Sequence, residues 1–105
     1  MINIKLKCDT PDVKGAQCIL TMDGHANYSD GNDIVCSAAS AIVYSLLGFL
    51  DNFYPGNFSL YMTSGHLELV VKDYKEDLIT AFEVVHIGLE QIAFQYPKNV
   101  NIELI

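Results

Sequence analysis

The amino-acid sequence predicts an α+β fold in which two amphipathic helices lie on one face of a mainly antiparallel sheet, in the order β-β-α-β-β-α-β. Three features support this prediction. Short segments alternate apolar and polar residues as strands do, two longer segments repeat apolar residues every three or four positions, and short turns join the strands. The length of 105 residues suits one domain, which we expect to span residues 1–105.

The first half of the chain predicts two strands followed by a helix. Residues 2–8 alternate with one apolar face, residues 9–15 contain proline and glycine and predict a turn, and residues 16–23 predict a second strand. A helix is expected over 34–50, where apolar residues recur at helical spacing directly after Asp33, a suitable N-cap. Because this apolar stripe is wide, we expect the helix to be largely buried.

The region after this helix predicts a loop and a β-hairpin. Residues 51–57 contain a Pro-Gly pair, which is typical of loops. Residues 58–63 and 66–72 alternate like strands on either side of Ser64 and Gly65. A two-residue connection that contains glycine favours a hairpin, so these two strands should be antiparallel neighbours.

The last part of the chain predicts a second helix and a final strand. Apolar residues recur with helical spacing over 74–96, and Pro97 ends this stretch. Asp73, which is followed three residues later by Glu76, resembles a capping box and is the expected start of the helix. Residues 99–105 alternate again and predict a strand.

The composition excludes some classes of partner. The formal net charge is −7 and arginine is absent, whereas nucleic-acid binding requires a basic surface, so we expect no nucleic-acid partner. No apolar run approaches the ~18 residues of a membrane span, and the first residues lack the apolar block of a signal peptide. We therefore expect a cytoplasmic protein without a membrane partner. Apolar residues on the second face of the sheet, together with its exposed edges, favour a homodimer.

The three cysteines, Cys8, Cys18 and Cys36, form no C-x-x-C pair. Their number and spacing argue against a disulfide scaffold and against a zinc site, so we expect no metal and no cofactor. Cys8 and Cys18 fall in predicted strands, where we interpret them as small buried apolar residues.

Cys36 stands in the first turn of the predicted helix, where a thiol meets the positive end of the helix dipole. This position favours the thiolate, which is the nucleophilic form of cysteine. His25 precedes the polar loop 27–33 and is a candidate base for Cys36, a pairing that cysteine hydrolases require. Asp33 is expected to cap the helix, although its carboxylate could instead orient His25. The simpler interpretation is a buried cysteine and an ordinary loop histidine, and His66 is a rival base.

Three residues near this pair are candidates to contact a substrate: Gly24, Tyr28 and Ser40. Gly24 permits a sharp exit from the second strand, although it also suits an ordinary turn. Tyr28 belongs to the loop 27–32, which is expected to close over the substrate. Ser40 lies one helical turn after Cys36, although a serine in this position often bonds back to its own helix.

The residues around Cys36 and His25 also resemble the signature of the ribosomal-processing cysteine protease (Prp) family. The similar residues are Asp23-Gly24-His25-Ala26 and, after the loop, Gly31, Asp33-Ile34-Val35-Cys36-Ser37-Ala38 and Ser40. That family is described as small homodimeric α+β proteases of certain bacteria, with relatives in phages. The resemblance implies that Cys36 is the nucleophile and His25 the base. The loop between them is about one residue shorter than the family pattern, and Ser37 stands where the family has alanine.

The resemblance implies a cysteine endopeptidase that removes a short N-terminal segment from a ribosomal protein of the large subunit. A phage relative would instead trim a virion protein. In either case an apolar, aromatic-containing segment should precede the cut, and a basic ribosomal protein would match the acidic charge of this chain.

Two other classes of function stay open from the residues themselves. One is a non-catalytic interaction or adaptor protein, either ribosome-associated or phage-encoded. The other is a different thiol enzyme, such as a thioesterase or a redox protein. A redox enzyme needs a resolving cysteine, and this chain has none close to Cys36 in sequence. A thiol phosphatase needs an arginine in its phosphate loop, and this chain has no arginine.

Overall fold

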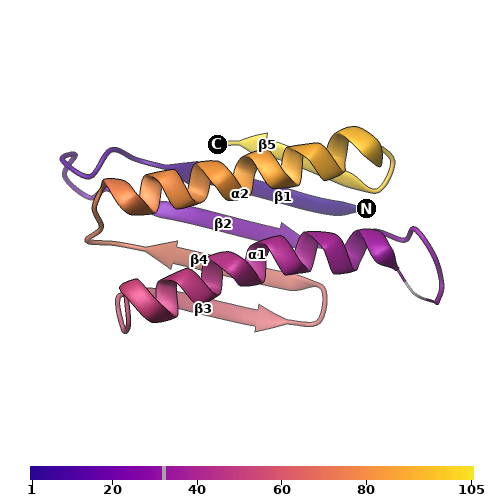
Figure 1. Ribbon diagram of the computed structural model, residues 1–105, viewed down its shortest axis with the longest axis horizontal. Helices are drawn as coiled ribbons and strands as arrows, with labels where there is room; N and C mark the ends of the chain where they lie inside the picture. Colours follow the sequence, from indigo (N-terminus) through magenta and orange to yellow (C-terminus); the bar gives the residue numbers. More distant parts are fainter. Residues whose placement is uncertain (32) are drawn as a thin grey trace.

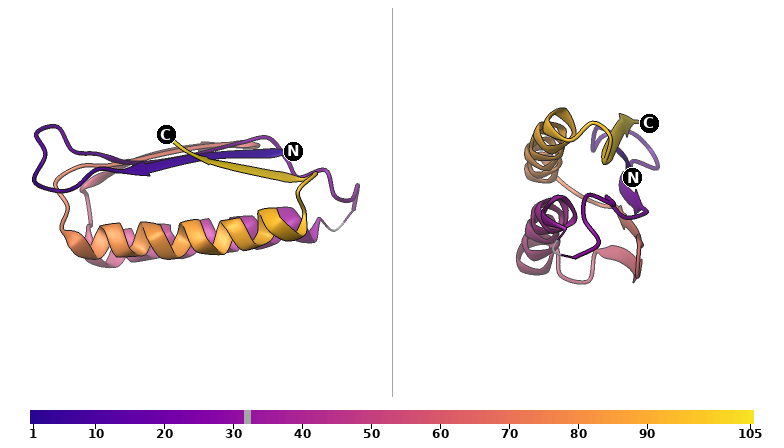
Figure 2. Two further views of the ribbon diagram at one scale, coloured as in Figure 1. Left: turned by 90° about the horizontal axis from the view of Figure 1, so that it is seen from above. Right: turned by 90° about the vertical axis from the view of Figure 1, so that its right-hand side faces the viewer.

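Two layers make up the fold, a five-stranded sheet and two helices that cover one of its faces (Figures 1 and 2). The computed structural model describes residues 1–31 and 33–105. The elements are β1 (Ile2–Cys8), β2 (Cys18–Asp23), α1 (Ile34–Phe53), β3 (Phe58–Thr63), β4 (His66–Val71), α2 (Glu76–Gln95) and β5 (Val100–Leu104). Their order and the two-layer arrangement confirm the predicted α+β fold. Residue 32, which belongs to the predicted loop 27–33, lies outside the described residues.

The sheet has the strand order β3-β4-β2-β1-β5. The pairs β1–β2, β2–β4 and β3–β4 are antiparallel, as the short turns predict for the two hairpins. The pair β1–β5 is parallel, because α2 carries the chain back along the sheet before β5 begins. Parallel strands require such a crossover, so the sheet is mixed but mostly antiparallel.

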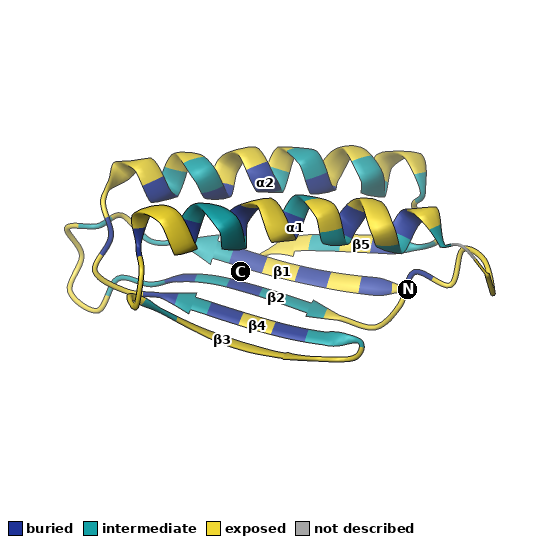
Figure 3. Ribbon diagram, turned by 60° about the horizontal axis from the view of Figure 1, so that its bottom comes forward, coloured by how far each residue is buried: buried dark blue, intermediate teal, exposed yellow. Residues whose placement is uncertain are grey.

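A row of leucines crosses the sheet in register on the side that faces the helices. Leu6 pairs with Leu20, and Leu20 pairs with Leu69, all three of which are buried. The row continues outward to Leu60 on β3 and to Leu104 at the end of β5, which are both exposed, whereas Val100 at the start of β5 is buried (Figure 3). The core therefore lies under the middle of the sheet and leaves an apolar margin at both edges.

Helix α1 is three residues longer than the predicted 34–50 and ends at Phe53. Its length and composition alone would allow it to cross a membrane. However, one side of the helix packs against the sheet in the position of a core helix. The buried residues of that side are Val35, Ala39, Val43, Leu46 and Leu50.

The predicted capping box at Asp73 is wrong. Helix α2 begins at Glu76 after Lys75, whose side chain makes no capping hydrogen bond, and Asp73 has a left-handed φ of 56°. The reason is tertiary, because the buried Tyr74 points away from the helix start and donates a hydrogen bond to the carbonyl of Asp9 at 2.7 Å. The hydroxyl of Tyr54, at the end of α1, accepts from the Lys75 N–H at 3.0 Å instead.

Cys8 and Cys18 are joined by a disulfide, which corrects the prediction that both are separate buried residues. They are directly opposite one another in the β1–β2 register, with a Cα–Cα distance of 4.0 Å. The sequence spacing does not reveal this, because it depends on how many residues the intervening turn uses. The two strands pair over six positions from Asn3 to Cys8, so the disulfide adds to a hairpin that already has a hydrogen-bonded ladder.

The face of the sheet that points away from the helices is more polar than expected. By strand alternation it carries Lys5 and Lys7 of β1, Thr21 and Asp23 of β2, and Glu68 of β4. It also carries Ile19, Val70 and the exposed Tyr61, but most of the other large exposed apolar side chains lie elsewhere. The most exposed of them on α2 are Val84, Ile87 and Phe94.

We expect Tyr54→Phe to lower the free energy of unfolding by about 1–2 kcal/mol. The change leaves the Lys75 N–H without its acceptor and removes the hydroxyl that donates to Asp77. Urea unfolding followed by circular dichroism measures the effect. Tyr61→Phe is the matched control, because Tyr61 is 59% exposed on β3. Equal stability of the two variants would contradict this role of Tyr54.

Candidate functional site

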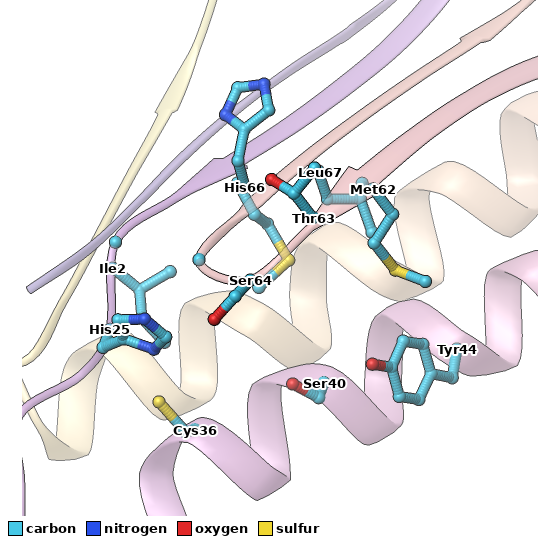
Figure 4. Close-up of a pocket in the computed structure, with 13 residues that line it drawn as sticks. Ile2, His25, Cys36, Ser40, Tyr44, Met62, Thr63, Ser64, His66 and Leu67 are labelled. Carbon is cyan, nitrogen blue, oxygen red and sulfur yellow. The ribbon is translucent and has the colours of Figure 1, made fainter.

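A pocket of about 250 Å³ lies at the end of the sheet where β2 ends, α1 begins and the β3–β4 hairpin turns (Figure 4). It is bounded on one side by α1 and on the other by the hairpin and the first residue of β1. The lining residues are Ile2, Met22, Gly24, His25, Cys36, Ser40, Tyr44, Met62, Thr63, Ser64, Gly65, His66 and Leu67. Four of the predicted site residues, Gly24, His25, Cys36 and Ser40, are thus brought to one pocket.

Cys36 is the third residue of α1 and is half-buried at the floor of this pocket. Figure 4 shows its sulfur directed toward the His25 ring. The backbone N–H of Ala26 donates a hydrogen bond to Cys36 Sγ at 3.2 Å. A donor aimed at the sulfur and the start of a helix are both placed where they would stabilise negative charge that develops on the sulfur during a reaction.

Two glycines determine where the His25 ring lies. Gly24 leaves β2 with a φ of 92°, and a Cβ at this position would be 2.4 Å from the carbonyl oxygen of Met1. Its N–H donates to the carbonyl of Gly65 at 2.8 Å, which ties the end of β2 to the hairpin turn. A Cβ on Gly65 would be 2.9 Å from His25 Nε2. The turn glycine therefore leaves the space that the imidazole occupies.

Asp33 caps α1, as the sequence predicts. Its Oδ1 accepts the N–H groups of Val35 at 3.1 Å and Cys36 at 3.0 Å. Its Oδ2 accepts the N–H of Tyr28 at 3.1 Å, so the same carboxylate holds the preceding loop. These donors, first of all the Cys36 N–H, lower the pKa of Asp33 below its ordinary value of 3.8. Both oxygens are thus engaged by backbone groups, and the structure shows the capping role rather than the orientation of His25.

Tyr28 is not among the residues that line the pocket. Its ring packs edge-on against Tyr96, with the centroids 5.3 Å apart and an angle of 80° between the planes. Nearly half of its surface is exposed. The proposal that Tyr28 closes over a substrate therefore stays a prediction that requires the loop to move.

His66, the rival base, contributes to the lining of the pocket, but its ring lies on the opposite face of the sheet from Cys36 (Figure 4). Its Nδ1 contacts Asp23, and its Nε2 lies 3.1 Å from Glu68 Oε1. The hydrogen bond with Asp23, and next that with Glu68, raises the pKa of His66 above its ordinary value. An imidazole held between two carboxylates on the far face is poorly placed to take a proton from Cys36.

Several residues that shape the site could not be predicted from the sequence patterns. The side chain of Asn99 donates to the carbonyl of Ala26 at 2.8 Å, across 73 positions of sequence. Tyr44 and Met62 form an apolar wall of the pocket, and the sequence predicts no role for either residue. The glycine of the Ser64-Gly65 turn was recognisable only as a turn residue, because its contact with His25 depends on the pairing of β2 with β4.

Among the residues that the structure describes, no group of three or more His, Cys, Asp or Glu side chains is arranged to hold a metal ion. The chemistry that the pocket offers is that of a thiol, an imidazole and backbone N–H groups. Together these can support nucleophilic attack by sulfur on a carbonyl group.

We expect the stabilisation that Asp33 provides to depend on pH. Because its pKa is lowered in the folded state, its contribution is fully present above 3.8 and is lost as the pH falls through the lower folded value. Urea unfolding of the wild type and Asp33→Ala across this range should show a stability difference that shrinks on acidification. Asp30→Ala, on the same exposed loop, is the control. A difference that does not vary with pH would contradict the capping by a charged carboxylate.

Comparison with known proteins gives a consistent result. The family described as "Cysteine protease Prp" matches residues 1–101. The ribosomal processing cysteine protease Prp of Mycoplasma pneumoniae is 36% identical over 86 residues, which cover 80% of this chain and 84% of that protein.

The fold is also similar to that of crystal structures of an essential ribosomal processing protease Prp from S. aureus. The complex with a covalently linked product peptide has a TM-score of 0.81 at 22% identity, and the complex with a substrate peptide has a TM-score of 0.80 at 19% identity. Each comparison covers the whole of both chains. At this level of identity the structures establish the shared fold.

Proposed function

Since the chain belongs to the Prp family and is a cysteine protease, we propose that Cys36 is its nucleophile and His25 its general base. The observation that carries this assignment is that both residues line one pocket, with the sulfur directed toward the imidazole. Cys36 is the free cysteine among the described residues, and its sulfur, at the start of α1, accepts a hydrogen bond from the Ala26 N–H. Membership of a protease family also favours catalysis over the adaptor alternative.

In the proposed reaction, His25 takes the thiol proton and the Cys36 sulfur attacks the scissile carbonyl carbon. The tetrahedral intermediate collapses to a thioester as His25 gives the proton to the leaving amine. Water, deprotonated by His25, then attacks the thioester, and the thiol leaves with the returned proton. The two half-reactions together consume one water and break one peptide bond.

The helix start offers fewer donors for the oxyanion than the sequence suggests. The N–H groups of Val35 and Cys36 already bind Asp33 Oδ1, and that of Ser37 binds the Asp33 carbonyl. The Ala26 N–H instead points at the sulfur, next to the position where the carbonyl would be attacked. We assign this N–H to the developing oxyanion, since a preoriented donor there stabilises the transition state.

The walls of the pocket suit an extended peptide with an apolar side chain. Cys36, Ser40 and Tyr44 follow one another at intervals of four along α1, which places Tyr44 about 12 Å from Cys36. That distance spans roughly three to four residues of extended chain. Tyr44 is 53% exposed and faces Met62 of the edge strand β3, which is 50% exposed (Figure 4). These two side chains would gain burial from an apolar residue of the substrate.

We propose as substrate a precursor of a large-subunit ribosomal protein that loses a short N-terminal segment. Support comes from the related protein of Mycoplasma pneumoniae, whose name refers to ribosomal processing, and from the net charge of −7, which attracts a basic protein. Such a substrate places the enzyme in the cytoplasm. Incubation with candidate ribosomal and virion precursors, followed by mass spectrometry of the new N-terminus, identifies the substrate and the cleaved bond.

We expect Cys36→Ala to abolish cleavage of that precursor, because the attacking sulfur is removed. His25→Ala should lower kcat by about 10²–10⁴-fold, the range that a general base contributes. His66→Ala should retain most of the activity, since its ring lies on the other face of the sheet. Circular dichroism checks that each variant folds. Cleavage by Cys36→Ala, or a loss confined to His66→Ala, would overturn the assignment.

We further propose that the protein forms a homodimer through the outer side of α2. Val84, Ile87 and Phe94 are 64%, 56% and 87% exposed and follow one another at helical spacing on that side. Contiguous exposed apolar side chains of this kind typically mark an interface. The open face of the sheet is less suitable because it is mostly polar.

Sedimentation velocity should therefore give about twice the chain mass of 11.7 kDa for the wild type. Ile87→Glu should sediment as a monomer, because the carboxylate would be buried without a partner. Val13→Glu, the same kind of substitution at a similarly exposed apolar residue (55%) in the turn between β1 and β2, is the matched control and should remain dimeric. A monomeric wild type, or a dimeric Ile87→Glu variant, would exclude this interface.

A further inference from the structure

We propose that Asn99 is a positioning residue for the nucleophile, because it holds the segment whose N–H contacts the Cys36 sulfur. Two hydrogen bonds connect these residues through Ala26. Asn99 Nδ2 donates to the Ala26 carbonyl at 2.8 Å, and the Ala26 N–H donates to Cys36 Sγ at 3.2 Å. The inference rests on the proposed function to the extent that Cys36 is taken as the reactive thiol.

Asn99 is suited to this role because its own backbone is fixed to the scaffold on both sides. Its N–H donates to the carbonyl of Tyr96, the C-cap of α2, at 2.9 Å. Its carbonyl accepts from the N–H of Ile2, the first residue of β1, at 2.9 Å. The amide that reaches Ala26 is therefore carried by the sheet and by α2, whereas the residues that it holds belong to a connecting segment.

The segment needs such support. Ala26 is 1% exposed, so its carbonyl would lose hydrogen bonding if the Asn99 amide were absent. The next residue, Asn27, has a φ of 56°, in the left-handed region that costs free energy for a residue other than glycine. Strained backbone of this kind persists only where surrounding contacts determine it. Without the Asn99 amide, the segment relaxes, and the Ala26 N–H turns away from the sulfur.

The consequence is chemical rather than only structural. The Ala26 N–H is the donor that holds the Cys36 sulfur in place before attack, and it is the group that we assign to the oxyanion after attack. His25 directly precedes Ala26, so the same relaxation displaces the base. Asn99 thereby links the far end of the chain to both reacting groups without touching the substrate.

Alkylation by iodoacetamide tests this proposal without any substrate. The rate of Cys36 modification near pH 7, read from the mass of its proteolytic peptide, should fall about tenfold in Asn99→Ala, which is the effect of losing about one hydrogen bond to the reacting sulfur. Asn101→Ala, the same substitution at an exposed position of β5, should match the wild type. With a peptide that the wild type cleaves, kcat of Asn99→Ala should fall while KM stays unchanged.

Equal alkylation of Asn99→Ala and the wild type near pH 7 in folded protein would overturn the proposal, as would a loss shared with Asn101→Ala. If Asn99→Ala does not fold, Asn99→Leu keeps the side-chain shape without the amide and has the same expected result. The unmodified protein gives an independent measurement, since the Asn99 side-chain amide protons should exchange slowly. Rapid exchange of both would also overturn the proposal. The alkylation and exchange measurements do not use the proposed ribosomal substrate. If that substrate proposal is wrong, only the cleavage assay will show it.

Discussion

The hydrogen bond from the Ala26 N–H to the Cys36 sulfur is the contact on which the arrangement of the site depends. It joins the segment that follows β2 to the first turn of α1, and these carry the imidazole and the thiol respectively. Asp33 makes the second connection between the same two segments, because its carboxylate binds the N–H of Tyr28 as well as the first turn of α1. The proposed base and the proposed nucleophile are thus held by backbone groups at both ends of the loop that separates them.

The rest of the fold supplies a rigid frame around this contact. The β3–β4 hairpin reaches the end of β2, where Gly65 accepts a hydrogen bond from Gly24 and leaves room for the His25 ring. A side chain at either glycine would collide with backbone or with the imidazole. Catalytic side chains held by packed elements keep their geometry better than those on free loops, so the glycines matter for chemistry as well as for turning the chain.

The distribution of the cysteines distinguishes hydrolysis from redox chemistry. Cys8 and Cys18 pair at one end of the β1–β2 hairpin, whereas Ile2 and Gly24, at its other end, line the pocket with Cys36. The strand between them is seven residues long, which corresponds to roughly 20 Å. The Cys36 sulfur therefore has no resolving thiol within reach among the described residues. This separation agrees with membership of a protease family.

The sequence by itself determined the features that depend on neighbouring residues. Alternation and helical spacing predict every strand and helix in order, Asp33 is recognisable as a cap, and Cys36 and His25 stand out because one local loop joins them. Only the tertiary structure decided the start of α2, the parallel pairing of β5, the Cys8–Cys18 disulfide and the contacts of Gly65 and Asn99. These depend on strand register and on packing between residues far apart in the chain, and local spacing contains no information about either.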